Sequence, residues 1–568
     1  MIVNLPNSLS VEALLKFDAG SHEAIDDDLL EPCYCPVSAV TEFLRGRKDV
    51  LHGSKGSGKT AVFTLLLEGF LNFTNSKGLN QILVPISEDV EYVVVKQRTA
   101  QYLQSTLPDE DLRFRFLWEA YILYRVALSI HKQDLLPISL REDLDEFIEL
   151  FSRSSGKPTI MEFLGGSKVK VSFRLGTENT FVAAPEFSID PSAIGQSVES
   201  EQAHIINLDA IKKELSEVLK AQNSIVYVLV DNIDKFSERE AYKVQRSMVD
   251  GLMQAIEGYK GIRNIKVKAF IRTEQYNKTD HASLSGQDKS GPRATELRWS
   301  ESDIRRLIAR RINYNFDAMF GEDNRIQFKY DEDDFYSAKG DDHKGIMLNV
   351  CNLVRSIFGE TNGSRKDRET SFSDHKAKEL ITLFMPRNID HFEVDGEDSS
   401  QQIFDWVSTH FQLANGKIVP RTIIVFLENV VRCSIRYYEE NDDITLVLKN
   451  ENDEYPLMTP GSVSKAFGQT QEHVVNGLRT STTHKPWQRR IAAVFPNGGT
   501  KAQLTSSEIK RITKIKNDTE LHDFCAYLRH LGALKRLTTD TPRAQEQVYS
   551  VPILLQRNWV KENEDVCD

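Results

Sequence analysis

One eight-residue stretch constrains the fold of this chain more than any other. It consists of Gly53, Ser54, Lys55, Gly56, Ser57, Gly58, Lys59 and Thr60. Glycines let a backbone curl so that successive N–H groups converge on phosphate oxygens. In this pattern the lysine reaches the β- and γ-phosphates of a nucleotide, and the threonine hydroxyl binds Mg²⁺. The stretch predicts a phosphate-binding loop with ATP and Mg²⁺ as ligands.

The flanking residues supply the context that this motif requires. Residues 49–52 read as the end of a short strand, and residues 59–73 carry apolar side chains at helical spacing. The positive N-terminus of that helix would face the phosphates. We therefore expect an α/β fold, a P-loop NTPase core built on a parallel sheet.

A second motif follows in the run Ser224–Val230, which is almost continuously apolar and rich in β-branched residues. Such a run is typical of a strand that is buried on both faces of a sheet. Asp231 follows it directly, and ligands of open α/β sheets bind at the carboxyl ends of the strands. Asp231 is therefore a candidate Mg²⁺ ligand beside Thr60. The alternative is a structural strand that ends in a turn aspartate.

The bulk composition fits a multidomain cytoplasmic protein. The chain has 568 residues, too many for one core, of which 40% are hydrophobic and 27% charged. No apolar run has the length of a bilayer span, so we expect no membrane partner. The N-terminal residues lack the pattern of a signal peptide. Among six cysteines, Cys33 and Cys35 form a close pair without other metal-ligand types nearby, and we interpret them as reduced thiols.

The C-terminal part differs in charge from the rest. The net charge is −12, yet residues 471–560 hold fourteen lysines and arginines against seven aspartates and glutamates. The pattern of this part predicts two helices and two strands in a winged-helix outline, at residues 506–516, 521–531, 534–537 and 548–553. We expect the following division: an N-terminal segment (1–44), a P-loop ATPase core (45–300) with a large insertion (about 76–205), a helical lid (301–445), a linker (446–470) and a winged-helix-like domain (471–560).

Together these motifs resemble the AAA+/STAND side of the P-loop ATPases, including origin-recognition-type ATPases. They resemble more closely a bacterial group of P-loop ATPases, some of them associated with defence against phage. The resemblance spans roughly residues 40–430 and, less firmly, the C-terminal part. It rests on the sequences GSKGSGKT at 53–60, VLVDNIDK at 228–235, FIRTE at 270–274, LRWSESD at 297–303 and NGKIVPRTIIVFL at 415–427.

The resemblance implies roles for several arginines. Arg272 and Thr273 stand where a sensor would read the γ-phosphate, and Arg421 matches an arginine that links nucleotide state to the lid. Arg263 is a candidate finger toward a neighbouring subunit of a homo-oligomer. Each of the three could instead be an ordinary surface arginine.

One position departs from the family pattern. Many relatives have Glu directly after the Walker B aspartate, whereas this chain has Asn232. An amide can orient a water molecule but cannot accept its proton as a general base. Either Asp234 serves as the base, or hydrolysis is slow and the protein acts as a nucleotide-controlled switch.

These observations support an ATP-binding and slowly ATP-hydrolysing switch in antiphage defence or a DNA transaction. Its partner would be DNA or an effector protein, bound through the C-terminal domain or the insertion. The alternative is a nucleic-acid-binding regulator with a structural nucleotide. Against that alternative, the helix at 521–531 has Asp518, Glu520 and Asp523 near its start, where they would repel phosphates. A small-molecule kinase is a third reading, which the expected lid and C-terminal domain disfavour.

Overall fold

The apolar run that ends at Val230 forms part of a five-stranded parallel sheet. The sheet appears in a computed structural model that describes residues 7–76, 78–87, 110–132, 168–173, 185–190, 204–233, 242–276, 293–320, 374–390, 400–440, 457–480, 485–496, 499–537 and 547–556. The chain divides into two compact units. We call residues 38–53 and 62–297 the sheet unit, and residues 1–37, 54–61 and 298–568 the helical unit.

The strand order of the main sheet is β2-β6-β7-β1-β8, and all four neighbouring pairs are parallel. The strands are β1 (Val50–Gly53), β2 (Asn80–Ile86), β6 (Ser224–Val230), β7 (Ile265–Arg272) and β8 (Ala294–Glu296). Thus β7 lies between the strand that leads into the glycine loop and the strand that ends before Asp231. The predicted α/β class with a parallel sheet is confirmed.

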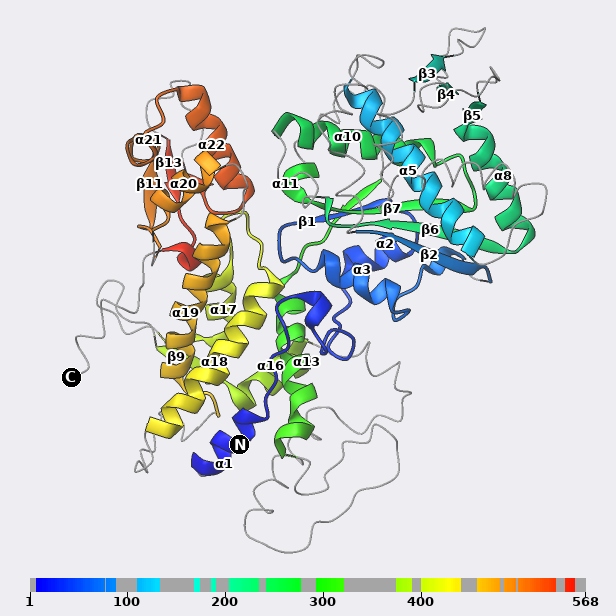
Figure 1. Cartoon of the computed structure of the whole chain (residues 1–568). Coiled ribbons are helices and arrows are strands. Elements are labelled where there is room, and N and C mark those ends of the chain that lie inside the picture. Colours follow the sequence, from blue (N-terminus) through cyan, green and yellow to red (C-terminus); the bar gives the residue numbers. More distant parts are fainter. Residues whose placement is uncertain are drawn as a thin grey trace, which may run out of the picture. The chain divides into compact units, whose positions relative to one another are not determined.

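Helices cover both faces of this sheet (Figure 1). All seven residues of β6 are buried, and they alternate between two sides. Val226, Val228 and Val230 pack in one core with α5 (Glu110–Lys132) and α10 (Tyr242–Gly258). On the other side Tyr227 stacks on Phe73, with ring centroids 3.9 Å apart. That side is covered by α2 (Ser38–Leu44) and α3 (Lys59–Leu67) (Figure 1).

The insertion expected at residues 76–205 contains core elements. Strand β2 pairs with β6 over its full length, and α5 packs against α10. We did not predict β2 from the sequence, because Pro85 interrupts its pattern of strand-forming residues. Proline is tolerated there because β2 is an edge strand of the sheet.

The remaining elements of the sheet unit include a small antiparallel sheet of order β3-β4-β5. Strand β3 spans Lys168–Phe173. Its antiparallel partner β4 spans Pro185–Asp190. The other elements are η2 (Thr74–Ser76), β5 (His204–Asn207), α8 (Leu208–Ala221) and α11 (Thr273–Tyr276).

The helical unit contains one core built from residues near the start of the chain and from the expected lid. Leu14 of α1, Ile308 of α13 and Phe426 of α18 are all buried in it. The elements are α1 (Asn7–Leu15), η1 (Ala24–Asp26), α13 (Glu301–Phe320), α16 (Asp374–Phe384), β9 (Asn388–Asp390), β10 (Ser400–Gln402), α17 (Ile403–Phe411), α18 (Pro420–Glu440) and α19 (Pro460–Arg479).

A second core in this unit belongs to the C-terminal residues. These residues include three short strands, which form an antiparallel sheet of order β11-β13-β12. Thr505 and Glu508 form a reciprocal capping box that begins α21. The elements are α20 (Lys485–Val494), β11 (Gln503–Thr505), α21 (Ser506–Thr513), α22 (Asp518–His530), β12 (Lys535–Arg536), β13 (Val548–Ser550) and η5 (Ile553–Leu555).

Helix α19 connects the two cores of the helical unit. Its Phe467 is buried in the first core and its Val475 in the second. The linker expected at 446–470 therefore overlaps a helix, and the boundary expected at 471 falls inside it. The sequence did not reveal this because a helix shared by two cores has apolar residues on both sides of any boundary.

The cysteine pair near the N-terminus is buried in the helical unit. Cys33 Sγ donates to Arg310 O and Cys35 Sγ donates to Asp303 O, each at 3.7 Å. Burial raises the pKa of Cys33 to about 12 and that of Cys35 to about 11. The four described cysteines are free thiols. Within the described ranges there is no cluster of three or more metal-ligating side chains, and no helix that is long and apolar enough to cross a bilayer.

Candidate nucleotide-binding site

The glycine loop curls back on itself between β1 and α3. Ser57 N–H donates to Ser54 O at 3.2 Å, and Lys59 Nζ donates to the same carbonyl at 2.9 Å. The φ angles of Gly56 and Gly58 are +79° and +97°, which residues with a side chain rarely adopt. Lys59 and Thr60 form the first turn of α3, where backbone N–H groups lack helical partners. This arrangement is a cradle for an anion.

Close packing also requires glycine at position 56. A Cβ atom there would lie 2.9 Å from Val419 Cγ1 and 3.0 Å from Arg421 Cβ. The backbone N–H of Arg421 donates to Gly56 O at 3.4 Å. The start of α18 thus contacts the loop directly, which the sequence alone did not show.

Trp299 is a second contact that the sequence prediction missed. Its indole Nε1–H donates to Ser57 O at 2.8 Å. Trp299 lies two residues before α13 and belongs to the segment 297–303 noted in the sequence, where it had no assigned role. A tryptophan next to a helix start was the only local signal, and such a residue more often packs in a core.

The carboxyl ends of β1, β6, β7 and β8 lie at one edge of the sheet because these strands are parallel. In the register, Gly53 pairs with Arg272, and Ala269 pairs with both Val50 and Val230. Asp231 therefore stands at the edge where β1 enters the loop. Its side chain is buried, and its backbone N–H donates to Ile86 O at 3.0 Å.

A histidine and two residues beyond β7 meet at the same edge. His52 Nδ1 lies 3.2 Å from Thr273 Oγ1, and the imidazole stacks on Tyr276 with centroids 4.4 Å apart. Burial raises the pKa of the Tyr276 hydroxyl. These contacts tie the end of β1 to the turn that follows Arg272. Arg272 itself is half-buried.

Asn232 adopts a left-handed backbone conformation, with φ of +58°. Asparagine tolerates this region better than most residues with a Cβ atom. The backbone conformation is thus a physical reason for asparagine at this position. Asp234, the candidate base, lies outside the described residues.

The two remaining arginines occupy different surroundings. Arg421 Nε donates to His22 O at 2.9 Å, so its guanidinium contacts the N-terminal segment within the helical unit. Arg263 is exposed and precedes β7, at the sheet edge opposite the carboxyl ends.

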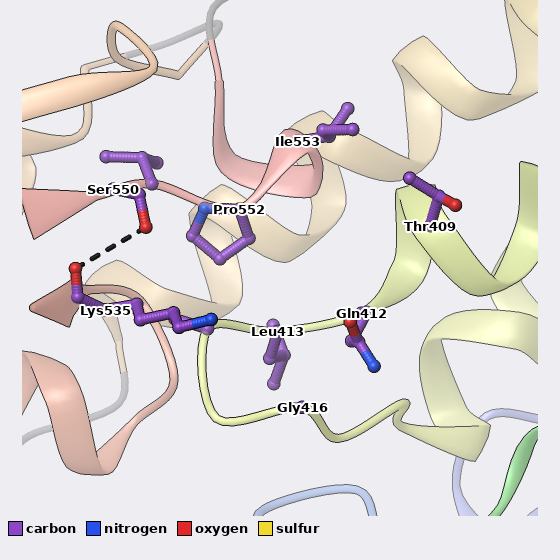
Figure 2. A pocket seen from close by; sticks show the side chains of 10 residues that line it. Thr409, Gln412, Leu413, Gly416, Lys535, Ser550, Pro552 and Ile553 are labelled. Atoms are coloured by element: carbon purple, nitrogen blue, oxygen red, sulfur yellow. Dashed lines mark hydrogen bonds between the residues drawn. The ribbon is translucent and has the colours of Figure 1, made fainter. Parts of the chain in front are cut away.

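The loop of residues 412–419, between α17 and α18, extends from the glycine loop to the C-terminal sheet. Ala414 N–H donates to Gly532 O at 2.8 Å, and Gly532 has φ of +75°. A cavity of about 230 Å³ lies between this loop and the residues of β12 and β13. Figure 2 shows the side chains that line it. Leu413 and Gln412 line one side and Lys535, Ser550 and Pro552 the other, and no glycine-loop residue takes part.

The C-terminal core carries its positive charges in two groups. Three cations pair with carboxylates nearby: Arg490 with Glu520, Lys501 with Glu508, and Lys510 with Asp518. The second group consists of exposed cations that form no ion pair within the described residues, namely Arg489, Arg511, Lys514, Lys516, Lys535 and Arg536.

The chain was compared with known proteins. It matches no family model, and no curated protein matches it. Among solved structures, similar ones include the Aeropyrum pernix ORC2 protein in ADPNP–ADP complexes (11% identity, 93% of this chain and 90% of that chain, TM-score 0.34). A second is the Aeropyrum pernix ORC1 protein in complex with DNA (10% identity, 90% and 86% coverage, TM-score 0.30). A third is the ADP form of that ORC2 protein (11% identity, 93% and 91% coverage, TM-score 0.27). TM-scores below 0.5 do not establish a common fold.

Proposed function

We propose that this protein binds ATP with Mg²⁺ and hydrolyses it slowly, as a molecular switch. The observation that carries the proposal is the glycine loop itself. Two of its glycines have positive φ, and Lys59 and Thr60 lie in the first turn of α3. The loop follows β1, which is separated by β7 alone from β6, the strand that ends directly before Asp231. Backbone N–H groups at such a turn are suited to phosphate oxygens.

Different groups of the site would bind different parts of the nucleotide. Lys59 would neutralise charge on the β- and γ-phosphates, and Gly53 to Thr60 would supply backbone donors. Thr60 and Asp231 would hold Mg²⁺, which neutralises phosphate charge when bound. A Mg²⁺ ion usually keeps several water ligands and takes few ligands from the protein. The Thr60 hydroxyl, the Asp231 carboxylate and the substrate phosphates would therefore be sufficient to bind it.

The same residues favour slow turnover. Asn232 cannot accept a proton from the attacking water, so the water would be oriented but not deprotonated there. Asp234 is the proposed base. Arg272 and Arg421, on β7 and α18, would respond to the γ-phosphate, which gives a switch with two states.

ATP turnover and binding by the full chain test this proposal. We expect wild type to bind Mg-ATP and to release phosphate slowly, and Lys59→Ala to lose both. Asp231→Ala should retain weak nucleotide binding and lose the Mg²⁺ dependence. Equal binding by wild type and Lys59→Ala would sink the proposal. Transfer of phosphate to a small molecule, instead of its release, would favour a kinase.

DNA binding through the C-terminal core is the second candidate, and it is favoured by the six exposed cations that form no ion pair with another described residue. Phosphate contacts make affinity fall steeply with salt. We expect the full chain to bind a DNA duplex, with a smaller salt slope for Arg511→Ala with Lys514→Ala. If the full chain bound no DNA, or bound it independently of salt, the DNA proposal would fail and a protein would be the remaining partner for this surface. The acidic start of α22 and the three internal ion pairs count against DNA.

The biological role that we propose is antiphage defence or a DNA transaction, with an effector protein or DNA as partner. Support comes from the resemblance of the motifs to defence-associated ATPases. Arg263 would act on a neighbouring copy in a homo-oligomer. Loss of phage protection in cells that carry Lys59→Ala, where wild type protects, is the corresponding test.

A further inference from the structure

We propose that Trp299 is a positioning residue of the nucleotide site, which aims a backbone donor of the glycine loop at phosphate. This inference rests on the proposed function and deepens it. Its starting point is the hydrogen bond from Trp299 Nε1 to Ser57 O at 2.8 Å. A peptide unit is planar and trans, so the C=O of Ser57 and the N–H of Gly58 point in opposite directions. Because the indole binds the Ser57 carbonyl, the Gly58 N–H is held on the opposite side of the peptide unit, where it would face a bound phosphate.

A second bond acts on the preceding peptide unit. The backbone N–H of Arg421 donates to Gly56 O, so two consecutive carbonyls of the loop are bound from outside. Gly56 and Gly58 both have positive φ, and glycine is the residue with the most backbone freedom to lose. External bonds reduce that freedom before a ligand arrives, which lowers the entropic cost of binding.

Trp299 is itself held by the start of α13. Ser300 N–H donates to Asp303 Oδ2 at 3.0 Å, and Asp303 N–H donates to Ser300 Oγ at 3.2 Å. This reciprocal bonding fixes the residue that follows Trp299. The ring also lies beside the next loop residue, since a Cβ at Gly58 would be 3.9 Å from Trp299 Cζ2. The indole therefore lies against two consecutive residues of the loop, Ser57 and Gly58.

Trp299→Phe removes the donor and keeps an aromatic ring, and Trp118→Phe is the matched control. Trp118 Nε1 also donates to a backbone carbonyl, that of Met248, at 3.0 Å in the sheet unit. We expect Mg-ADP and Mg-ATP to bind the Trp299 variant about 3- to 10-fold more weakly, the effect of one hydrogen bond. The control should bind them like wild type. Trp299 should also report binding by its fluorescence, so the Mg-ADP-induced change in emission should be lost in Trp299→Phe and kept in Trp118→Phe.

The possible outcomes distinguish a failure of the Trp299 positioning role from a failure of the proposed nucleotide binding. If wild type binds Mg-ADP and Lys59→Ala does not, the site is real. Unchanged affinity and an unchanged fluorescence response in Trp299→Phe would then overturn the positioning role alone. Equal loss in Trp299→Phe and Trp118→Phe would also overturn it, because the cause would be general destabilisation. If wild type itself binds no nucleotide, the proposed function fails first.

Discussion

At the scale of single residues, Asn232 illustrates how a backbone angle restricts side-chain choice. Its φ of +58° disfavours most residues with a Cβ atom, by about 1–2 kcal/mol. We predict that Asn232→Gly leaves the free energy of unfolding nearly unchanged, whereas Asn232→Ala lowers it by about 1 kcal/mol. Urea unfolding of both variants measures the difference. Equal stability of the two variants would mean that the left-handed conformation does not govern this position.

The buried thiols predict a pH dependence of stability. Cys33 and Cys35 have pKa values of about 12 and about 11 in the folded protein, above the ordinary value of 9.0. Between pH 9 and 11 the unfolded chain therefore loses protons that the folded chain keeps, so stability falls as pH rises. The expected slope is about 1.4 kcal/mol per pH unit for each thiol.

Replacing both thiols should flatten this decline. We expect Cys33→Ala with Cys35→Ala to lose less stability than wild type between pH 9 and pH 10, although the variant starts lower at pH 7.5. Urea unfolding under reducing conditions at the three pH values gives the comparison. Parallel pH profiles for the two proteins would contradict the assignment.

Residues of the site differed in how far the sequence could predict them. The glycine loop and Asp231 follow local rules, because a motif and a strand end determine them. Trp299, His22 and Val419 contact the loop or Arg421 from distant parts of the chain, and no local pattern signals such contacts. Only the folded chain brings them together.

At the scale of elements, the same contrast holds. The strand at 224–230 was predictable from its unbroken apolar pattern. Strand β2 was not, because Pro85 is compatible with a strand only at the edge of a sheet, and edge position is a property of the whole sheet. The helix expected at 59–73 ends at Leu67, soon followed by Gly69 with φ of +79°.

The contact between the loop 412–419 and Gly532 can be tested by substitution. A Cβ there would lie 2.9 Å from Asn415 Nδ2, and the φ of +75° adds backbone strain. We predict that Gly532→Ala lowers the free energy of unfolding by about 2–4 kcal/mol, from strain and overpacking together. Urea unfolding measures it.

Gly416→Ala is the matched control, since it has the same φ of +75° but only the end of Arg298 at 3.4 Å. It should cost about 1–2 kcal/mol, the strain alone. Adding Asn415→Gly to Gly532→Ala should restore part of the loss. If the two alanine variants were equally stable, close packing between the loop and the C-terminal core would be refuted.

At the scale of the whole molecule, the helical unit is assembled from separate parts of the chain. Arg311 of α13 forms a buried ion pair with Asp27, with Nη2 and Oδ2 2.5 Å apart. Both side chains are almost fully buried, at 2% and 3% exposure. Removing one partner from such a pair leaves an uncompensated charge in the interior.

We predict that Asp27→Ala destabilises the protein by about 3–5 kcal/mol. Asp374→Asn, which breaks the more exposed pair with Arg305, should cost about 0–1 kcal/mol. Urea unfolding of the two variants provides the measurement. A double variant, Asp27→Ala with Arg311→Met, should recover stability relative to Asp27→Ala. A loss for Asp27→Ala no larger than that for Asp374→Asn would contradict a stabilising role of the buried ion pair.

The discontinuity of the helical unit has a consequence for synthesis on the ribosome. Residues 1–37 are translated early, but Arg311 and the rest of their core come from the part of the chain after residue 297. At ~5–20 residues per second, the early segment waits on the order of tens of seconds for its partners. During that interval Leu14 and Phe17 have no core to enter, so nascent chains of this protein should be clients of chaperones that shield apolar segments until translation is nearly complete.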